Sequence, residues 1–291
     1  MKNGIESESP RQDQRRNQLL ATALTAWDLQ RTRKRPTRDA QTRHMVLKTH
    51  DRLRWLAEAE LGVPKQERSF LKAGDASAPG VLLIHDTRQS PADVLPLGRA
   101  LGEAGLTVHG LLLADYGHGV TERPEARWRA TLQQLRLGHR LLTDTCSEVH
   151  VVGVGFGAAL ALHLAARERV ASLVLIAPAL VPRVPLWVRA LWGLRLLRLR
   201  RVRRRLGLLV DATEGMKLAQ DQVGKLVVPM FGVQCDDDEL ASPQSLRLLQ
   251  KRARHERCRF QVFPTGGHDV LAAHGADGLQ RDIVDFIKHR A

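Results

Sequence analysis

The sequence has few cysteines, few aromatic residues and no long hydrophobic run. Its three cysteines, Cys146, Cys235 and Cys258, form no C-x-x-C pair. Such a sparse, odd set argues against a disulfide framework and predicts a cytoplasmic protein. Aromatic residues make up 4% of the chain, so its core must be built from Leu, Val and Ala. The sequence offers no stretch of about 18 uncharged apolar residues, which argues against a membrane-spanning helix.

Positive charge, in contrast, is abundant and concentrated in one segment. The formal net charge is +14, and Arg183–Arg205 contains nine arginines and no acidic residue. A local basic patch suggests an anionic partner. Three hypotheses stay open for residues 185–206: a lid over a site, peripheral contact with an anionic membrane surface through Arg195–Arg205, and nucleic-acid binding. Nucleic acid ranks last, because no RNA-binding module accompanies the patch and aromatic stacking residues are few.

The chain divides into an extension and a main domain. Residues 1–68 are predicted to form a disordered tail, polar and charged over 1–17, followed by a helical extension over 41–61 that packs on the main domain. From Ser69 to Ala291 strand and helix patterns alternate, which predicts an α/β domain with a mostly parallel sheet and helices on both faces. The expected strands are 80–85, 106–113, 149–154, 172–176, 225–233 and 259–263, and the expected helices are 91–105, 124–142, 158–167, 243–254 and 279–290. Residues 178–224 interrupt the alternation as a candidate cap insertion.

A nucleophile is missing where the pattern calls for one. Residues 153–157 read G-V-G-F-G between a β-branched strand and an Ala/Leu-rich helix. This is the frame of a nucleophile elbow, G-x-S-x-G, and Gly155 stands at the serine position. Glycine has no side chain that could attack a substrate. It does relax a turn that is strained for any residue with a Cβ atom.

Three segments follow expected strands: Gly155 ends the strand at 149–154, residues 234–243 follow the strand at 225–233, and residues 266–269 follow the strand at 259–263. This order of nucleophile position, acid loop and base loop resembles the α/β-hydrolase fold. Residues 85–94 look like the H-G-F-T-G-x-x-x-D loop of bacterial carboxylesterases and monoacylglycerol lipases, with Asp86 at the second position, and residues 115–119 (D-Y-G-H-G) look like the G-H-G loop of that group. The resemblance covers about residues 69–291. It implies an α/β-hydrolase fold, to which the sequence pattern adds a cap insertion and an N-terminal helical extension that the resemblance does not cover.

The resemblance also implies roles for individual residues. Asp238 would be the catalytic acid and His268 the catalytic base, with Gly155 as the degenerate nucleophile position. The amides of Thr87 and Phe156 would form the oxyanion hole. Asp86 would place a carboxylate beside that hole, where it opposes a developing oxyanion.

Other acidic residues of the acid loop have a simpler interpretation. Asp236, Asp237 and Glu239 are more typical of a solvated turn than of a metal cluster, because no histidine with suitable spacing accompanies them. The sequence therefore predicts neither a metal nor a cofactor.

Three functions follow from these residues. The first is a protein related to carboxylesterases and lipases with little or no ester hydrolase activity, able to bind an acyl or other apolar small molecule. The second is a non-catalytic ligand-, membrane- or partner-binding pseudoenzyme. The third is general-base chemistry by an Asp238–His268 dyad. If the remaining groups stand in working geometry, Gly155→Ser alone is expected to restore some ester hydrolysis.

Overall fold

The fold was obtained as a computed structural model. It describes residues 40–75, 77–87, 89–113, 127–181, 200–274 and 278–288, with backbone only for residues 127 and 200–211. The described residues do not include the expected tail, the loop at 115–119 or the arginines of the basic segment from Arg183 to Arg198. The membrane contact expected for Arg195–Arg205 therefore rests on the sequence alone.

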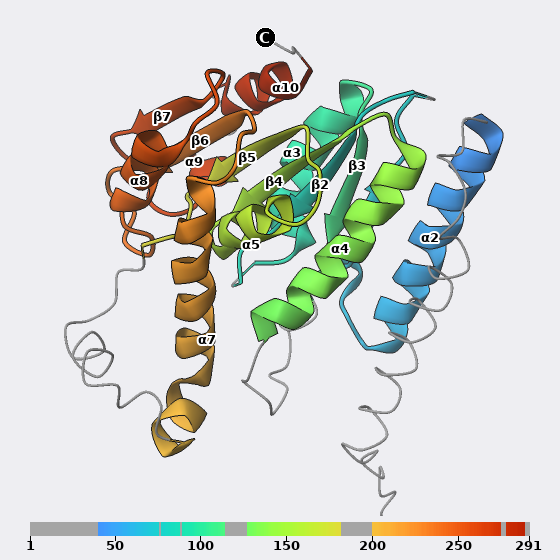
Figure 1. Cartoon of the computed structure of the whole chain (residues 1–291). Helices are drawn as coiled ribbons and strands as arrows, with labels where there is room; N and C mark the ends of the chain where they lie inside the picture. Colours follow the sequence, from blue (N-terminus) through green and yellow to red (C-terminus); the bar gives the residue numbers. More distant parts are fainter. Residues whose placement is uncertain are drawn as a thin grey trace, which may run out of the picture.

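A seven-stranded sheet forms the centre of the molecule, in the order β1-β3-β2-β4-β5-β6-β7 (Figure 1). All neighbouring strands are parallel except β1, which pairs antiparallel with β3 at one edge. The expected parallel sheet is thus confirmed. The strands are β1 Phe70–Lys72, β2 Gly80–Ile84, β3 Thr107–Leu111, β4 Val149–Val154, β5 Ser172–Ile176, β6 Met230–Cys235 and β7 Arg259–Phe263.

Helices cover both faces of this sheet. Successive residues of a strand point to opposite faces, so Val81 and Leu83 join one hydrophobic cluster and Leu82 and Ile84 the other. The first cluster packs α3, α9 and α10; the second packs α4, α5, α7 and α8. The helices are α2 Ala40–Glu60, α3 Pro91–Glu103, α4 Arg127–Thr145, α5 Phe156–Ala165, α7 Arg200–Val223, α8 Gln244–Arg252, α9 Val270–His274 and α10 Gln280–Lys288, with a 3₁₀ turn at Lys65–Glu67.

The N-terminal extension packs on the main domain through α2, as expected. Its anchor is the buried Arg43, whose guanidinium donates to the Asp75 carbonyl (2.7 Å), to Thr107 Oγ1 (2.6 Å) and to the Thr145 carbonyl. Leu47 beside it is fully buried. A buried charge is costly unless its donors are satisfied, and these three bonds from three segments satisfy it. They fix α2 against α4 and β3.

Most expected elements lie within about three residues of the observed bounds, and two differ more. Strand β6 begins at Met230 and not at Lys225, since Pro229 lacks the amide hydrogen that a ladder needs. The second half of the expected cap insertion is the long helix α7, which lies across α5 and buries Ala219 and Val223 in the core (Figure 1). Among the described residues, none of the helices is both long and apolar enough to cross a bilayer.

Candidate active site

The turn between β4 and α5 has no room for a side chain at its tip. Gly155 has φ 57° and ψ −121°, in the left-handed region that strains residues with a Cβ atom. A Cβ atom built on Gly155 would overlap Cγ and Oδ1 of Asp86 and would lie 2.8 Å from its Cβ. The side chain that an elbow would present is therefore replaced in space by Asp86, which comes from the loop after β2.

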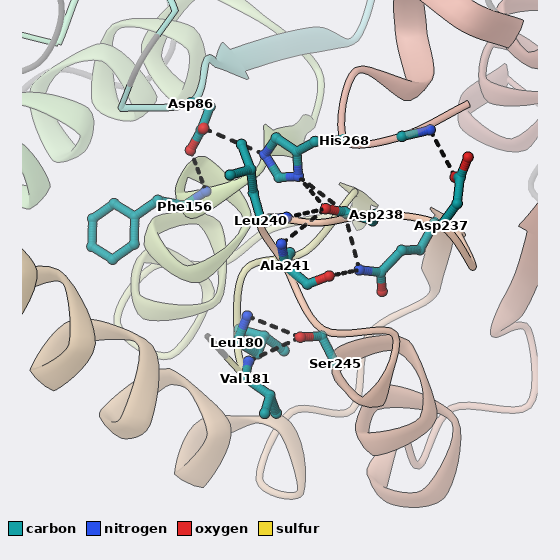
Figure 2. A network of polar contacts seen from close by, with 12 residues as sticks. Asp86, Phe156, Leu180, Val181, Asp237, Asp238, Leu240, Ala241, Ser245 and His268 are labelled. Atoms are coloured by element: carbon teal, nitrogen blue, oxygen red, sulfur yellow. Dashed lines mark hydrogen bonds and ion pairs between the residues drawn. The ribbon is translucent and has the colours of Figure 1, made fainter. Parts of the chain in front are cut away.

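The Asp86 carboxylate is held at the start of α5. Its Oδ1 accepts a hydrogen bond of 2.6 Å from the Phe156 amide, and its Oδ2 lies 3.5 Å from Nε2 of His268 (Figure 2). The residue is 6% exposed. Because Phe156 is the first residue of α5, its N–H has no intrahelical acceptor and points out at the positive end of the helix dipole. An anion is the natural partner for such a group.

The backbone of Asp86 is fixed by its neighbours. The Leu113 amide donates to Nε2 of His85 (3.1 Å), which places the His85 proton on Nδ1, from where it is donated to the Asp86 carbonyl (2.7 Å). Burial lowers the pKa of His85, which keeps the ring neutral. On the other side of the turn, the Gln89 amide also donates to this carbonyl (3.1 Å). The carboxylate is thus presented by an ordered turn.

Asp238 and His268, the residues predicted as acid and base, meet on the other side of His268 from Asp86. Nδ1 of His268 lies 2.9 and 3.0 Å from the two carboxylate oxygens of Asp238, which is fully buried. Asp238 Oδ1 also accepts from the amides of Leu240 and Ala241, both at 2.9 Å. Burial by itself would raise the pKa of Asp238, but the bonds from His268 and from these amides outweigh it and lower the pKa.

A second acidic residue shapes the loop that carries His268. The Asp237 carboxylate accepts from the amides of Gly266 (3.1 Å) and Gly267 (2.8 Å), as Figure 2 shows in part. Both glycines have positive φ, at 134° and 65°, so the loop turns sharply just before His268. Asp237 therefore helps to hold the loop that carries His268. In the described part of the chain, no group of acidic, His and Cys side chains could hold a metal ion.

Solved structures with the same architecture include lipolytic and hydrolytic enzymes. One of LipS and LipT, two metagenome-derived lipolytic enzymes, aligns at a TM-score of 0.63 and 18% identity over 77% of this chain and 98% of its own. The monoacylglycerol lipase of Paleococcus ferrophilus aligns at 0.61 and 15%, over 75% and 97%. A serine-to-alanine mutant of the meta-cleavage product hydrolase CumD from Pseudomonas fluorescens, complexed with acetates, aligns at 0.53 and 19%, over 75% and 93%.

The chain has the α/β-hydrolase fold. No family model and no curated protein matches the sequence itself. With about 15–19% identity to these structures, the likeness fixes the fold, and the chemistry must be argued from the site.

In this α/β-hydrolase site one imidazole stands between two carboxylates. Burial would lower the pKa of His268, but hydrogen bonding to Asp238 and Asp86, with the charge of both, raises it to about 9. The ring is therefore an imidazolium at neutral pH, with protons on both nitrogens. It donates toward Asp238 and faces Asp86 across a distance that is long for a hydrogen bond. The three side chains thus form a row of alternating charge, in which the imidazolium of His268 lies between the carboxylates of Asp238 and Asp86.

The structure brings most of the predicted site residues together. Asp238 and His268 are hydrogen-bonded, and His268 reaches Gly155 through Asp86. Phe156 directs its amide into the site, while Thr87 lies partly buried in the turn after Asp86, where its oxyanion role stays a prediction.

The position of Asp86 differs from the expectation. Asp86 was expected beside the oxyanion hole and lies in it, bonded to the very amide that would bind the oxyanion. The sequence signal that could have revealed this contact is the combination of Asp86, just after β2, with Gly155 at the elbow. The expectation that Gly155→Ser alone restores some hydrolysis stays a prediction, and the Asp86 side chain would have to shift to make room for the new side chain.

Proposed function

We propose that the protein is a serine-less member of the α/β-hydrolase fold that does not hydrolyse carboxylic esters and acts as a cytoplasmic binding protein. One observation carries this proposal: the Asp86 carboxylate fills the nucleophile position and accepts the hydrogen bond of the Phe156 amide. The site therefore holds, in the ground state, an anion where a hydrolase leaves room for the reacting carbonyl.

Each step of acyl transfer meets an obstacle at this site. No side chain at position 155 can form an acyl intermediate, and the Phe156 donor is already engaged. An oxyanion forming about 4 Å from the Asp86 carboxylate would be repelled by roughly 4 kcal/mol at an effective dielectric constant near 20. That cost corresponds to a rate about 10³-fold lower.

General-base catalysis by the Asp238–His268 pair is the weaker alternative. A base needs a free lone pair, and a pKa of about 9 leaves roughly one ring in a hundred neutral at pH 7. The ion pair with Asp86 opposes deprotonation further. Binding without chemistry agrees better with this network.

The basic segment supplies a second, separate part of the proposal. We infer from its composition that Arg195–Arg205 contacts anionic partners, with a membrane surface preferred over nucleic acid. Salt dependence of liposome binding tests this, since surface charges are screened beyond about 10 Å at 0.1 M salt.

The test of the missing hydrolysis uses p-nitrophenyl acetate and butyrate at pH 7 to 8. Wild type and His268→Gln are expected to give the same slow release of p-nitrophenol, and a fluorophosphonate probe should label neither. The double variant Gly155→Ser with Asp86→Gly frees the space and supplies the hydroxyl, so labelling should appear there. Wild-type turnover that His268→Gln removes would refute the proposal.

A further inference from the structure

The last strand of the sheet, β7, has an open outer edge (Figure 1). It pairs with β6 on one side, and none of the described strands pairs with its other side. The Phe263 carbonyl accepts from the Asp236 amide just after β6 (2.9 Å), and backbone groups of successive strand residues point to alternate sides. The N–H and C=O groups of Phe260 and Val262 are therefore directed away from β6, where an added strand would bond to them.

A hollow of about 180 Å³ lies beside this edge and is lined by residues of α8, β6 and β7. Its lining includes the apolar side chains of Pro243, Leu246 and Val262, with Arg247 as the cation. Val262 is 48% exposed, and it shares a face of β7 with Phe260, which packs against the core on the α8 side. A strand added at the edge of β7 would place alternate side chains on this same face, next to the hollow.

Positive charge surrounds the edge. Residues 247–259, from α8 to the first residue of β7, contain six cations and a single acidic residue. Of these cations, Arg247, Lys251 and Arg254 are exposed, and none of the ion pairs in the described part of the chain includes them. Asp236 adds one acidic group to the lining of the hollow, at the end of β6. The net charge around the edge is thus positive, which favours an anionic partner.

We propose that the edge of β7 binds an extended acidic peptide segment of a partner protein, which adds to the sheet as a further strand. The edge offers carbonyl acceptors as well as amide donors. A peptide backbone satisfies both, whereas the phosphate groups of a lipid surface or a nucleic acid supply acceptors alone. An apolar side chain of the peptide enters the hollow, and its acidic side chains meet Arg247 and Lys251. A second copy of this chain is a poor occupant, because pairing β7 with β7 brings two sets of these cations together.

The test uses an eight-residue peptide of alternating Glu and Val, labelled with fluorescein, and follows its binding to the full chain by fluorescence anisotropy at pH 7. Wild type should bind the peptide saturably, and more weakly as salt rises, because exposed charges are screened. Val262→Pro removes an outward amide from an edge strand, where proline is tolerated, and should weaken binding at least about 10-fold. Val262→Thr keeps the amide and the shape of the side chain, so this matched control should bind like wild type.

A pair of charge reversals tests the acidic character of the partner. Arg247→Glu with Lys251→Glu should weaken peptide binding at least about 10-fold. Lys48→Glu with Arg99→Glu is the matched control, since it makes the same change of net charge at exposed positions of α2 and α3, away from β7. This control should have a much smaller effect.

Several results would overturn the inference. These are no saturable binding by wild type, binding that Val262→Pro leaves unchanged, equal losses for the two pairs of charge reversals, and an eight-nucleotide oligothymidylate that binds as tightly as the peptide. A dimer of this chain that Val262→Pro dissociates would make a second copy the occupant. If Val262→Pro fails to fold, the same peptide with N-methyl groups on alternate amides tests the hydrogen bonds on wild type, and an unchanged affinity would refute strand addition.

Discussion

The two halves of the candidate site differ in how they are held. Asp238 is buried and its carboxylate accepts hydrogen bonds from two backbone amides, a glutamine side chain and His268. Asp86, in the nucleophile half, has one short hydrogen bond and one long ion pair. The acid–base half joins an imidazole to a buried carboxylate, while in the nucleophile half a carboxylate from another loop fills the space beside Gly155.

This difference separates the structural from the chemical parts of the site. The Phe156 amide, which was predicted to be an oxyanion donor, belongs to the backbone of α5 and is present whatever side chain stands at residue 155. The acid and base are tied into loops that also stabilise the fold, as the Asp237 bonds to Gly266 and Gly267 show. Residue 155, as a glycine, has no side chain that could hold a loop in this way.

The largest loss of stability is expected at Asp238, in the half of the site that is held by more hydrogen bonds. Asp238→Ala should lower the free energy of unfolding by about 3–5 kcal/mol, since it strands buried donors and leaves His268 without its main partner. Asp86→Ala should cost only about 1–2 kcal/mol, because one buried amide loses its acceptor. Urea denaturation of both variants at pH 7 measures the contrast. Equal losses would mean that both halves carry the same structural load.

An intermediate effect concerns the space at the elbow. Gly155→Ser should cost about 3 kcal/mol, the sum of a strained φ and a collision with Asp86. Adding Asp86→Gly should recover the collision part. Gly224→Ser is the matched control, since a Cβ atom there meets nothing within 4 Å, and it should change stability by less than about 0.5 kcal/mol. A full cost at Gly155→Ser that Asp86→Gly leaves unchanged would show that the two residues do not share one space.

The sequence predicted the sheet better than the site, for physical reasons. Val149–Val154 and Ser172–Ile176 are short apolar runs that match β4 and β5 residue for residue, because burial on both faces leaves a local signature. The edge strand Phe70–Lys72 was not predicted, since three residues carry no period. Helix α7 was hidden by its arginine-rich first turns.

Within the site, loop order located Asp238 and His268, but it could not reveal the Asp86–Phe156 bond. That bond joins residues 70 positions apart and depends on the exact length of the turn after β2. Asp237 was interpreted as part of a solvated turn, and its exposed position agrees with this, but its bonds to two loop amides have no sequence pattern.

The smallest expected effect is a change in the free energy of unfolding with pH, which depends on His268. His268 has its pKa raised from 6.5 to about 9 by partners that exist only in the folded protein. A raised pKa stabilises the folded state fully below the unfolded value of 6.5, and this contribution disappears as the pH rises through about 9. Linkage gives a loss of about 2 kcal/mol between pH 7 and pH 9. Wild type and His268→Gln should therefore converge in unfolding free energy over this range. Because Asp86 and Asp238 both raise that pKa, Asp86→Asn should move the convergence to lower pH without removing it. A difference between wild type and His268→Gln that stays constant from pH 7 to 9 would show that the imidazole is not charged between the two carboxylates. His268 would then be neutral and available as a general base, as in a hydrolase.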